Sequence, residues 1–221
     1  MSRFFPADKI VFTGNPVRQG LLNAQVDRAA ALQQMGLSPH KRTLLIVGGS
    51  LGARTLNESV LGNLPLVRQQ NDIQFIWQTG GYYKEEIKAE LARRGKPDNL
   101  YVTDFISDMA TAYAVADLVI SRAGAGSISE FCLLGKPVIL VPSPNVAEDH
   151  QTKNALALVQ RDAALYVKDS EARMTLLPLA INTITQPDRL QQLSTNIRVL
   201  ARPNAASDIA DEVLRLAGQQ A

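Results

Sequence analysis

The chain has 221 residues, and 46% of them are hydrophobic, which is enough for a buried core in one large domain or two small ones. Its 23 basic and 21 acidic residues leave a net charge of +2, which argues against a nucleic-acid partner, since such a partner needs a basic face. No apolar run approaches the roughly 20 residues that cross a bilayer, and the amino terminus shows no signal-peptide core, so a cytoplasmic protein is expected.

The lone cysteine and the two histidines bear on redox state and metal binding. Cys132 stands in the apolar run FCLL, which predicts a small buried side chain in a reducing compartment. His40 and His150 lie far apart and fit no metal-ligand spacing. Neither a metal ion nor another cofactor is therefore expected.

The first 40 residues differ from the rest of the chain. A strand-like run at 10–14 precedes a turn at Asn15-Pro16, and a helix follows that ends near Gly36. We expect residues 1–40 to form a lead-in linker that packs on a domain made by residues 41–221.

Apolar runs and helical periods alternate beyond residue 40. Six runs rich in Val, Ile and Leu are predicted as strands covered on both faces, at 43–49, 73–80, 99–105, 116–120, 136–142 and 163–167. Amphipathic helices are expected at 53–64 and 82–95, and only helical patterns remain after Ser170, one of them starting at Ser207. The alternation predicts an α/β fold, a doubly wound Rossmann-like parallel sheet with right-handed crossovers.

Ligands bind such sheets beyond the carboxyl ends of the strands, where loops meet the first turns of helices. The loop GGSLGART, residues 48–55, follows the first of the six predicted strands. Gly49 would let a ligand approach the backbone, and Ser50 would add a hydroxyl donor beside free amides that favour a phosphate. A tight turn with Arg54 in solvent explains the loop equally well, and the loop fits neither the dinucleotide pattern nor the Walker pattern.

Two interpretations also remain for SRAGAGSISE, residues 121–130. Ser127 and Glu130 have the spacing of a capping box, which would satisfy the first amides of a helix. A capping box requires neither Arg122 nor the glycines at 124 and 126. Taken alone, the stretch favours the capping role, but a carboxylate one turn inside a helix, beside amides that could hold a phosphate, is also suited to accept both hydroxyls of a ribose. The stretch therefore suggests a nucleotide.

Polar side chains also occur in PSPNVAEDHQTKNA and in GNPVR. Gln151 and Asn154 are three residues apart and share a helix face, where amides can donate to and accept from sugar hydroxyls. His150 is more typical of a surface or capping histidine than of a catalytic base. Arg18 follows a rigid turn and would stack on a base or neutralise phosphate, although a solvated arginine is the default interpretation.

Taken together, GNPVR, GGSLGAR, TDFISDMATAYAVADLVISRAGAGSISE and GKPVILVPSPNVAEDHQTKNA resemble, in this order, motifs of the MurG family of peptidoglycan glycosyltransferases. The resemblance implies the carboxyl-terminal, donor-binding half of a GT-B fold, which has two Rossmann-like domains. It also implies transfer of N-acetylglucosamine from UDP-N-acetylglucosamine to lipid I with inversion. The full enzyme would then act at the cytoplasmic face of the cell membrane, in peripheral association with it.

The resemblance also assigns roles to residues of this chain. It implies that Glu130 binds the ribose hydroxyls, that the backbone of Ile106 meets uracil, and that Gln151 reads the sugar. Arg18 and Ser50 would contact the donor near its diphosphate and nucleotide. The phosphate-facing helix start would comprise Ala125, Gly126, Ser127, Ile128, Ser129 and Glu130. Gly49, Arg122, His150 and Asn154 complete the expected donor-binding set, and no catalytic base is assigned.

The family's amino-terminal acceptor domain, with its glycine-rich motif, has no counterpart in this sequence. We therefore expect a domain-sized chain that binds donor and is inactive alone, with lipid I bound through the other domain. Two other classes stay open, namely a UDP-N-acetylglucosamine epimerase of the same architecture and a non-catalytic nucleotide-binding module.

Overall fold

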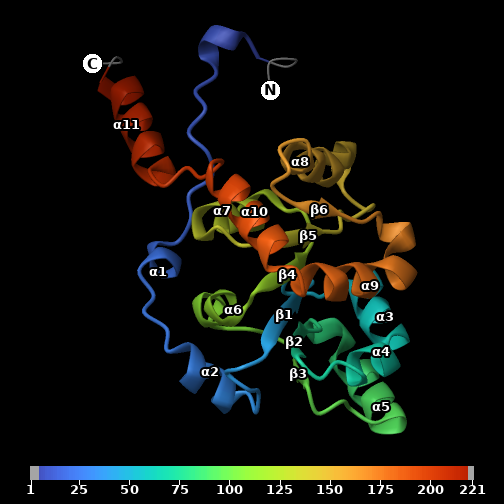
Figure 1. The fold of residues 1–221 in the computed structure, drawn as a ribbon. Coiled ribbons are helices and arrows are strands. Elements are labelled where there is room, and N and C mark those ends of the chain that lie inside the picture. The colour runs from blue at the N-terminus through green and yellow to red at the C-terminus, as the bar shows by residue number, and fades with distance from the viewer. Residues whose placement is uncertain (1–4, 219–221) are drawn as a thin grey trace.

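The computed structural model describes residues 5–218 and contains a six-stranded, fully parallel sheet in the order β3-β2-β1-β4-β5-β6 (Figure 1). The strands are β1 (Arg42–Val47), β2 (Ile73–Gln78), β3 (Leu100–Thr103), β4 (Leu118–Ser121), β5 (Val138–Leu140) and β6 (Leu165–Tyr166). All six lie where the sequence predicts them, but each is shorter than predicted, because flanking residues such as Gly48, Gly80, Asp104 and Pro137 belong to the loops. The doubly wound α/β prediction is confirmed.

Helices cover both faces of the sheet (Figure 1). On one face lie α3 (Arg54–Gly62), α4 (Leu64–Arg68), α5 (Lys84–Arg94) and α9 (Ala172–Ile184). On the other lie α1 (Gln19–Leu22), α2 (Arg28–Gln34), α6 (Met109–Val115), α7 (Ala125–Leu134) and α8 (His150–Val159). The helix α10 (Pro187–Arg198) contributes one buried leucine and one buried isoleucine to different faces, and α11 (Ala205–Gly218) follows it.

Strand β1 shows why the sequence needs two covered faces. Leu44 and Ile46 enter one hydrophobic cluster, whereas Leu45 and Val47 enter the other. Because successive strand side chains point to opposite faces, a continuous apolar strand requires helices on both sides. Cys132 is buried in the second cluster, as its apolar context predicts.

Helix ends follow their local signals in several places. The Asp27 carboxylate caps α2 by accepting from two amides of its first turn, and Gly36 adopts φ of +71° after the helix, where its end is predicted. The predicted helix 82–95 is present as α5, whose C-cap residue is Gly95 with φ of +78°. The predicted helix at 53–64 is present as α3, which ends at Gly62, and Asn63 separates it from α4.

Two predictions near the chain ends are wrong. Residues 10–14 form no strand, because no neighbouring strand pairs with them; instead Phe12 lies with its ring 5.1 Å from the Arg202 guanidinium carbon. The last helix begins at Ala205 rather than at Ser207, whose hydroxyl lies inside the first turn and donates to the Asn204 carbonyl. In Figure 1 this helix and the first described residues extend away from the sheet on the same side.

The segment before β1 makes several contacts with the rest of the chain. Helix α2 contacts α6, and α1 contacts both α6 and α7. Arg28 of α2 donates to the Asp117 carboxylate at 2.9 Å, at the start of β4. Over the described residues 5–218, no helix has the length and apolar character needed to cross a membrane.

Candidate nucleotide-binding site

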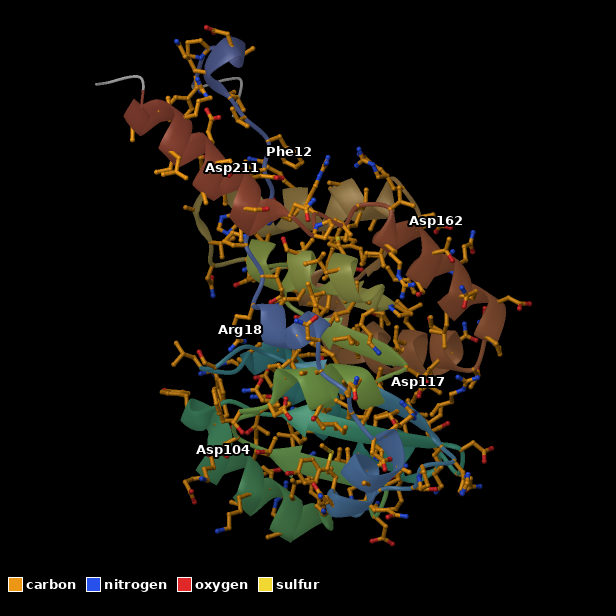
Figure 2. The ribbon with its side chains drawn as sticks, turned by 90° about the vertical axis from the view of Figure 1, so that its left-hand side faces the viewer. Phe12, Arg18, Asp104, Asp117, Asp162 and Asp211 are labelled. Atoms are coloured by element: carbon orange, nitrogen blue, oxygen red, sulfur yellow. The ribbon has the colours of Figure 1, made fainter. Side chains whose placement is uncertain are left out.

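The sheet reverses its winding between β1 and β4, and this point is where open α/β sheets bind ligands. A cavity of about 280 Å³ lies at the carboxyl ends of these strands. We call it the switch-point cavity, and its lining comprises Arg18, Val47, Gly49, Ser50, Gln78, Phe105, Ile106, Ser107, Met109, Tyr113, Ser121, Ser127 and Glu130. Figure 2 shows Arg18 and Asp104 at one end of the sheet and Asp117, which precedes β4, at the other.

The loop after β1 forms one wall of the switch-point cavity and is held by strand β2. The buried Gln78 side chain accepts from the Gly48 amide at 3.1 Å and donates to the Gly49 carbonyl at 2.8 Å. Gly52 has φ of +83°, and a Cβ there would lie 2.1 Å from the Thr79 carbonyl oxygen, so that only glycine fits. These contacts fix the loop and leave Gly49 and Ser50 exposed on the cavity wall.

Helix α7 supplies the opposite wall, and it starts without a side-chain cap. Gly124 is the N-cap residue, and the first backbone hydrogen bond into the helix runs from the Ile128 amide to the Gly124 carbonyl at 3.0 Å. The amides of residues 125–127 therefore precede the first intrahelical bond, as the first amides of any helix do. Ser127 is the third helical residue rather than the N-cap, so the predicted capping box with Glu130 is wrong.

Glu130 takes a different partner. Its Oε2 atom accepts from the Tyr113 hydroxyl of α6 at 2.9 Å, inside the switch-point cavity that both residues line. Tyr113 is only 3% exposed. Burial, reinforced by the neighbouring Glu130 carboxylate, raises the pKa of Tyr113 well above its usual range. The phenol therefore remains a proton donor, and the carboxylate is the acceptor.

The residues that the family resemblance assigns to the start of α7 lie on two different surfaces. Ser127 and Glu130 line the switch-point cavity. Ala125, Ile128 and Ser129 instead line a groove on the other side of α7, together with residues 11–15. There the Asn15 amide donates to the Ser129 hydroxyl at 3.1 Å. A Cβ added at Gly126 would meet no atom within 4 Å.

Gln151 and Asn154 share a face of α8, as predicted, but this face holds the turn that precedes α7. The Gln151 Oε1 atom accepts from the amides of Ala123 at 3.2 Å and Ser143 at 2.9 Å. Asn154 donates to the Ala123 carbonyl at 3.2 Å. Neither side chain is part of the lining of the switch-point cavity. Among residues 5–218, the Gln151 amide nitrogen has no hydrogen-bond partner and can still donate.

Arg122 and His150 also lie outside the cavity lining. Arg122 pairs with the Asp169 carboxylate and donates to the Val141 carbonyl at 3.0 Å, while Asp169 accepts from the Thr55 hydroxyl at 2.8 Å. The Asp169 carboxylate thus connects the first turn of α3 to the turn before α7. His150 is exposed, and its Nδ1 lies 2.8 Å from the Ala147 carbonyl oxygen, as a helix-start histidine would.

Sequence reasoning missed Tyr113 and Gln78. Tyr113 lies in the helical stretch MATAYAV, where a tyrosine is expected to be an ordinary core residue. Gln78 ends a strand that is buried along its whole length, and a polar side chain at that position was a signal for a structured loop beyond it. Within residues 5–218, no group of three His, Cys, Asp or Glu side chains is arranged to hold a metal ion.

The sheet order and the position of the cavity define a doubly wound, Rossmann-like domain with its cavity at the switch point. The chain belongs to a family of glycosyltransferases, because residues 43–213 match the Glycosyltransferase family 28 C-terminal domain.

Relatives and solved structures agree with this family. A Bacteroides fragilis protein named UDP-N-acetylglucosamine--N-acetylmuramyl-(pentapeptide) pyrophosphoryl-undecaprenol N-acetylglucosamine transferase is 61% identical over 99% of this chain and 58% of its own length. A Flavobacterium psychrophilum protein of the same name is 43% identical over 100% of this chain and 59% of its own. The chain thus spans less than two thirds of the length of these curated relatives.

Two solved structures have a similar fold. The crystal structure of Acinetobacter baumannii MurG has 33% identity and a TM-score of 0.73, covering 96% of this chain and 58% of that one. A UDP-GlcNAc 2-epimerase from Neisseria meningitidis has a TM-score of 0.68, covering 97% of this chain and 57% of that one. Its identity of 16% shows a shared fold alone.

Proposed function

We propose that this chain is the donor-binding domain of an inverting N-acetylglucosaminyltransferase. The donor would be UDP-N-acetylglucosamine and the acceptor lipid I, which becomes lipid II in peptidoglycan synthesis. The 61% identity to a Bacteroides transferase of that name supports this proposal. The observation that carries it is the switch-point cavity, where the Glu130 carboxylate lies one turn inside a helix that begins without a side-chain cap.

The chemistry of the cavity walls suits uridine diphosphate. A volume of about 280 Å³ is close to the lower end of ligand pockets, roughly 300–1,000 Å³, so the cavity is sized for the nucleotide part of the donor. Glu130 would accept from the ribose hydroxyls, and the Ile106 backbone would meet uracil. The α7 amides with Ser50 and Arg18 would face the diphosphate.

Transfer places new negative charge on the leaving diphosphate while the acceptor hydroxyl attacks the anomeric carbon. Arg18, Gly49 and Ser50 line the cavity beside the start of α7, and with the first α7 amides they would stabilise this charge. Gln151 would reach the sugar with its remaining amide donor. We infer further that the full enzyme acts at the cytoplasmic face of the membrane, in peripheral contact with its lipid substrate.

The test is calorimetric titration of the purified chain with UDP, UDP-N-acetylglucosamine and NAD. We expect both uridine nucleotides to bind and NAD to bind far more weakly. Glu130→Gln should weaken UDP binding about tenfold or more, because a hydrogen bond to a charged group contributes about 1.5–3 kcal/mol.

Glu85→Gln, a change to an exposed carboxylate on α5, is the matched control and should leave UDP affinity unchanged. Preference for NAD, or equal UDP affinity in Glu130→Gln and the unmodified chain, would contradict the proposal. Conversion of UDP-N-acetylglucosamine to its 2-epimer by the chain would favour the epimerase alternative instead.

A further inference from the structure

The contact between Tyr113 and Glu130 joins two helices across the switch-point cavity. Tyr113 is on α6, and its ring packs edge-on against Phe131 of α7, with centroids 5.6 Å apart at 82°. The hydroxyl at the far end of the same ring reaches the Glu130 carboxylate at 2.9 Å. The ring therefore fixes the position of the hydroxyl by packing.

The Tyr113 hydroxyl is the partner of the Glu130 carboxylate. In the part of the chain that the structure describes, this carboxylate has no second hydrogen-bond or ion-pair partner. A carboxylate can accept at about four lone-pair sites, so most of its accepting capacity stays open toward the cavity. An unsupported glutamate would sample several rotamers and would have to be ordered when a ligand binds.

We propose that Tyr113 is a positioning residue that holds the Glu130 carboxylate in the orientation which receives the two ribose hydroxyls of the donor. This inference rests on the proposed function. Because burial raises the pKa of Tyr113 well above its usual range, the phenol is protonated near neutral pH and donates to Glu130. The Glu130 carboxylate accepts this hydrogen bond. Its remaining lone pairs can accept further hydrogen bonds from hydroxyl groups of a ligand.

A purely structural role makes a different prediction. If Tyr113 only fills the core between α6 and α7, phenylalanine would fill the same space and pack on Phe131 in the same way. Loss of the hydroxyl would then change the affinity for all ligands of the cavity equally, or not at all. The two roles are distinguished by whether the loss of affinity in Tyr113→Phe requires the ribose hydroxyls of the ligand.

The experiment compares UDP with 2′,3′-dideoxyuridine diphosphate, by calorimetry, on the unmodified chain and on Tyr113→Phe. We expect the unmodified chain to prefer UDP. Tyr113→Phe should lose about three- to tenfold in UDP affinity, the usual effect of removing one hydrogen bond, and should bind the dideoxy compound as the unmodified chain does. The thermal unfolding temperature of each variant shows that it is folded.

Tyr101→Phe is the matched control, because Tyr101 is a half-buried tyrosine on β3 outside the lining of the switch-point cavity. It should leave both affinities unchanged. Equal losses for both ligands in Tyr113→Phe, or an unaltered preference for UDP, would overturn the positioning role alone. If the unmodified chain binds UDP no better than the dideoxy compound, the proposed ribose contact of Glu130 fails, and this inference fails with it.

Discussion

Among single residues, the two glycines at the start of α7 occupy positions whose backbone conformation and surroundings would also accept a residue with a side chain. Neither Gly124 nor Gly126 has a left-handed φ, and a Cβ at either position would meet nothing within 4 Å. Glycine inside a helix costs up to about 1 kcal/mol relative to alanine. Gly124 is the N-cap residue, a position where glycine is common. Close approach of a ligand to the backbone would explain Gly126, in contrast to Gly52, which the loop itself requires.

This difference predicts opposite effects of one substitution on stability and on binding. Gly126→Ala should raise the free energy of unfolding by up to about 1 kcal/mol, measured by urea denaturation, and should lower UDP affinity. Gly62→Ala in α3, which also has open space at its Cβ position, should stabilise the chain without affecting UDP. If Gly126→Ala binds UDP as well as the unmodified chain, backbone approach at this position is ruled out.

At the scale of elements, α6 is the helix that carries Tyr113 to the cavity, and its start is capped by Asp108. The carboxylate accepts from the Thr111 amide at 3.1 Å and from the Thr111 hydroxyl at 2.6 Å. These hydrogen bonds, that of the side-chain hydroxyl first, lower the pKa of Asp108. The cap therefore contributes to folding in a pH-dependent way.

Because the pKa of Asp108 is lower in the folded chain, the stabilisation is complete above the unfolded value of about 4 and is lost as the pH falls through the folded value. Asp108→Ala should lower the free energy of unfolding by about 1 kcal/mol at pH 7, as loss of a cap usually does, and by less near pH 3. Urea denaturation at both pH values measures this. Asp108→Asn, which keeps a capping oxygen, should show a smaller loss, and a pH-independent loss in Asp108→Ala would show that the ionised cap is not responsible.

The elements also show what sequence reasoning can and cannot supply. Strand positions were predictable because long runs of Val, Ile and Leu have few alternatives to a doubly covered sheet. The strand at 10–14 failed because strand propensity is realised only where a neighbour pairs with it. The capping box failed because the S-x-x-E spacing does not say which residue begins the helix, and here Gly124 does.

The site itself was predictable only in part. Loops at the carboxyl ends of β1 and β4 were found, since the parallel fold brings them together. The hydrogen bond between Tyr113 and Glu130 was not, because it depends on how α6 and α7 pack, which no local pattern records. The same holds for Gln151, whose oxygen supports the turn before α7 although its sequence context suggested sugar contact alone.

At the scale of the whole molecule, the sheet order brings β1 and β4 together, and the loops that follow them form opposite walls of one cavity. The segment before β1 completes this cavity, since Arg18 belongs to its lining although it lies ahead of the first strand (Figure 2). If the cavity binds the donor as proposed, the segment 5–40 would take part in donor binding through Arg18.

The most direct measurement is a crystal structure of the chain grown with UDP. We predict that the diphosphate lies against the amides of residues 125–127, with the ribose hydroxyls within hydrogen-bonding distance of Glu130. UDP bound away from the carboxyl ends of β1 and β4, or bound there with its ribose remote from Glu130, would contradict the account.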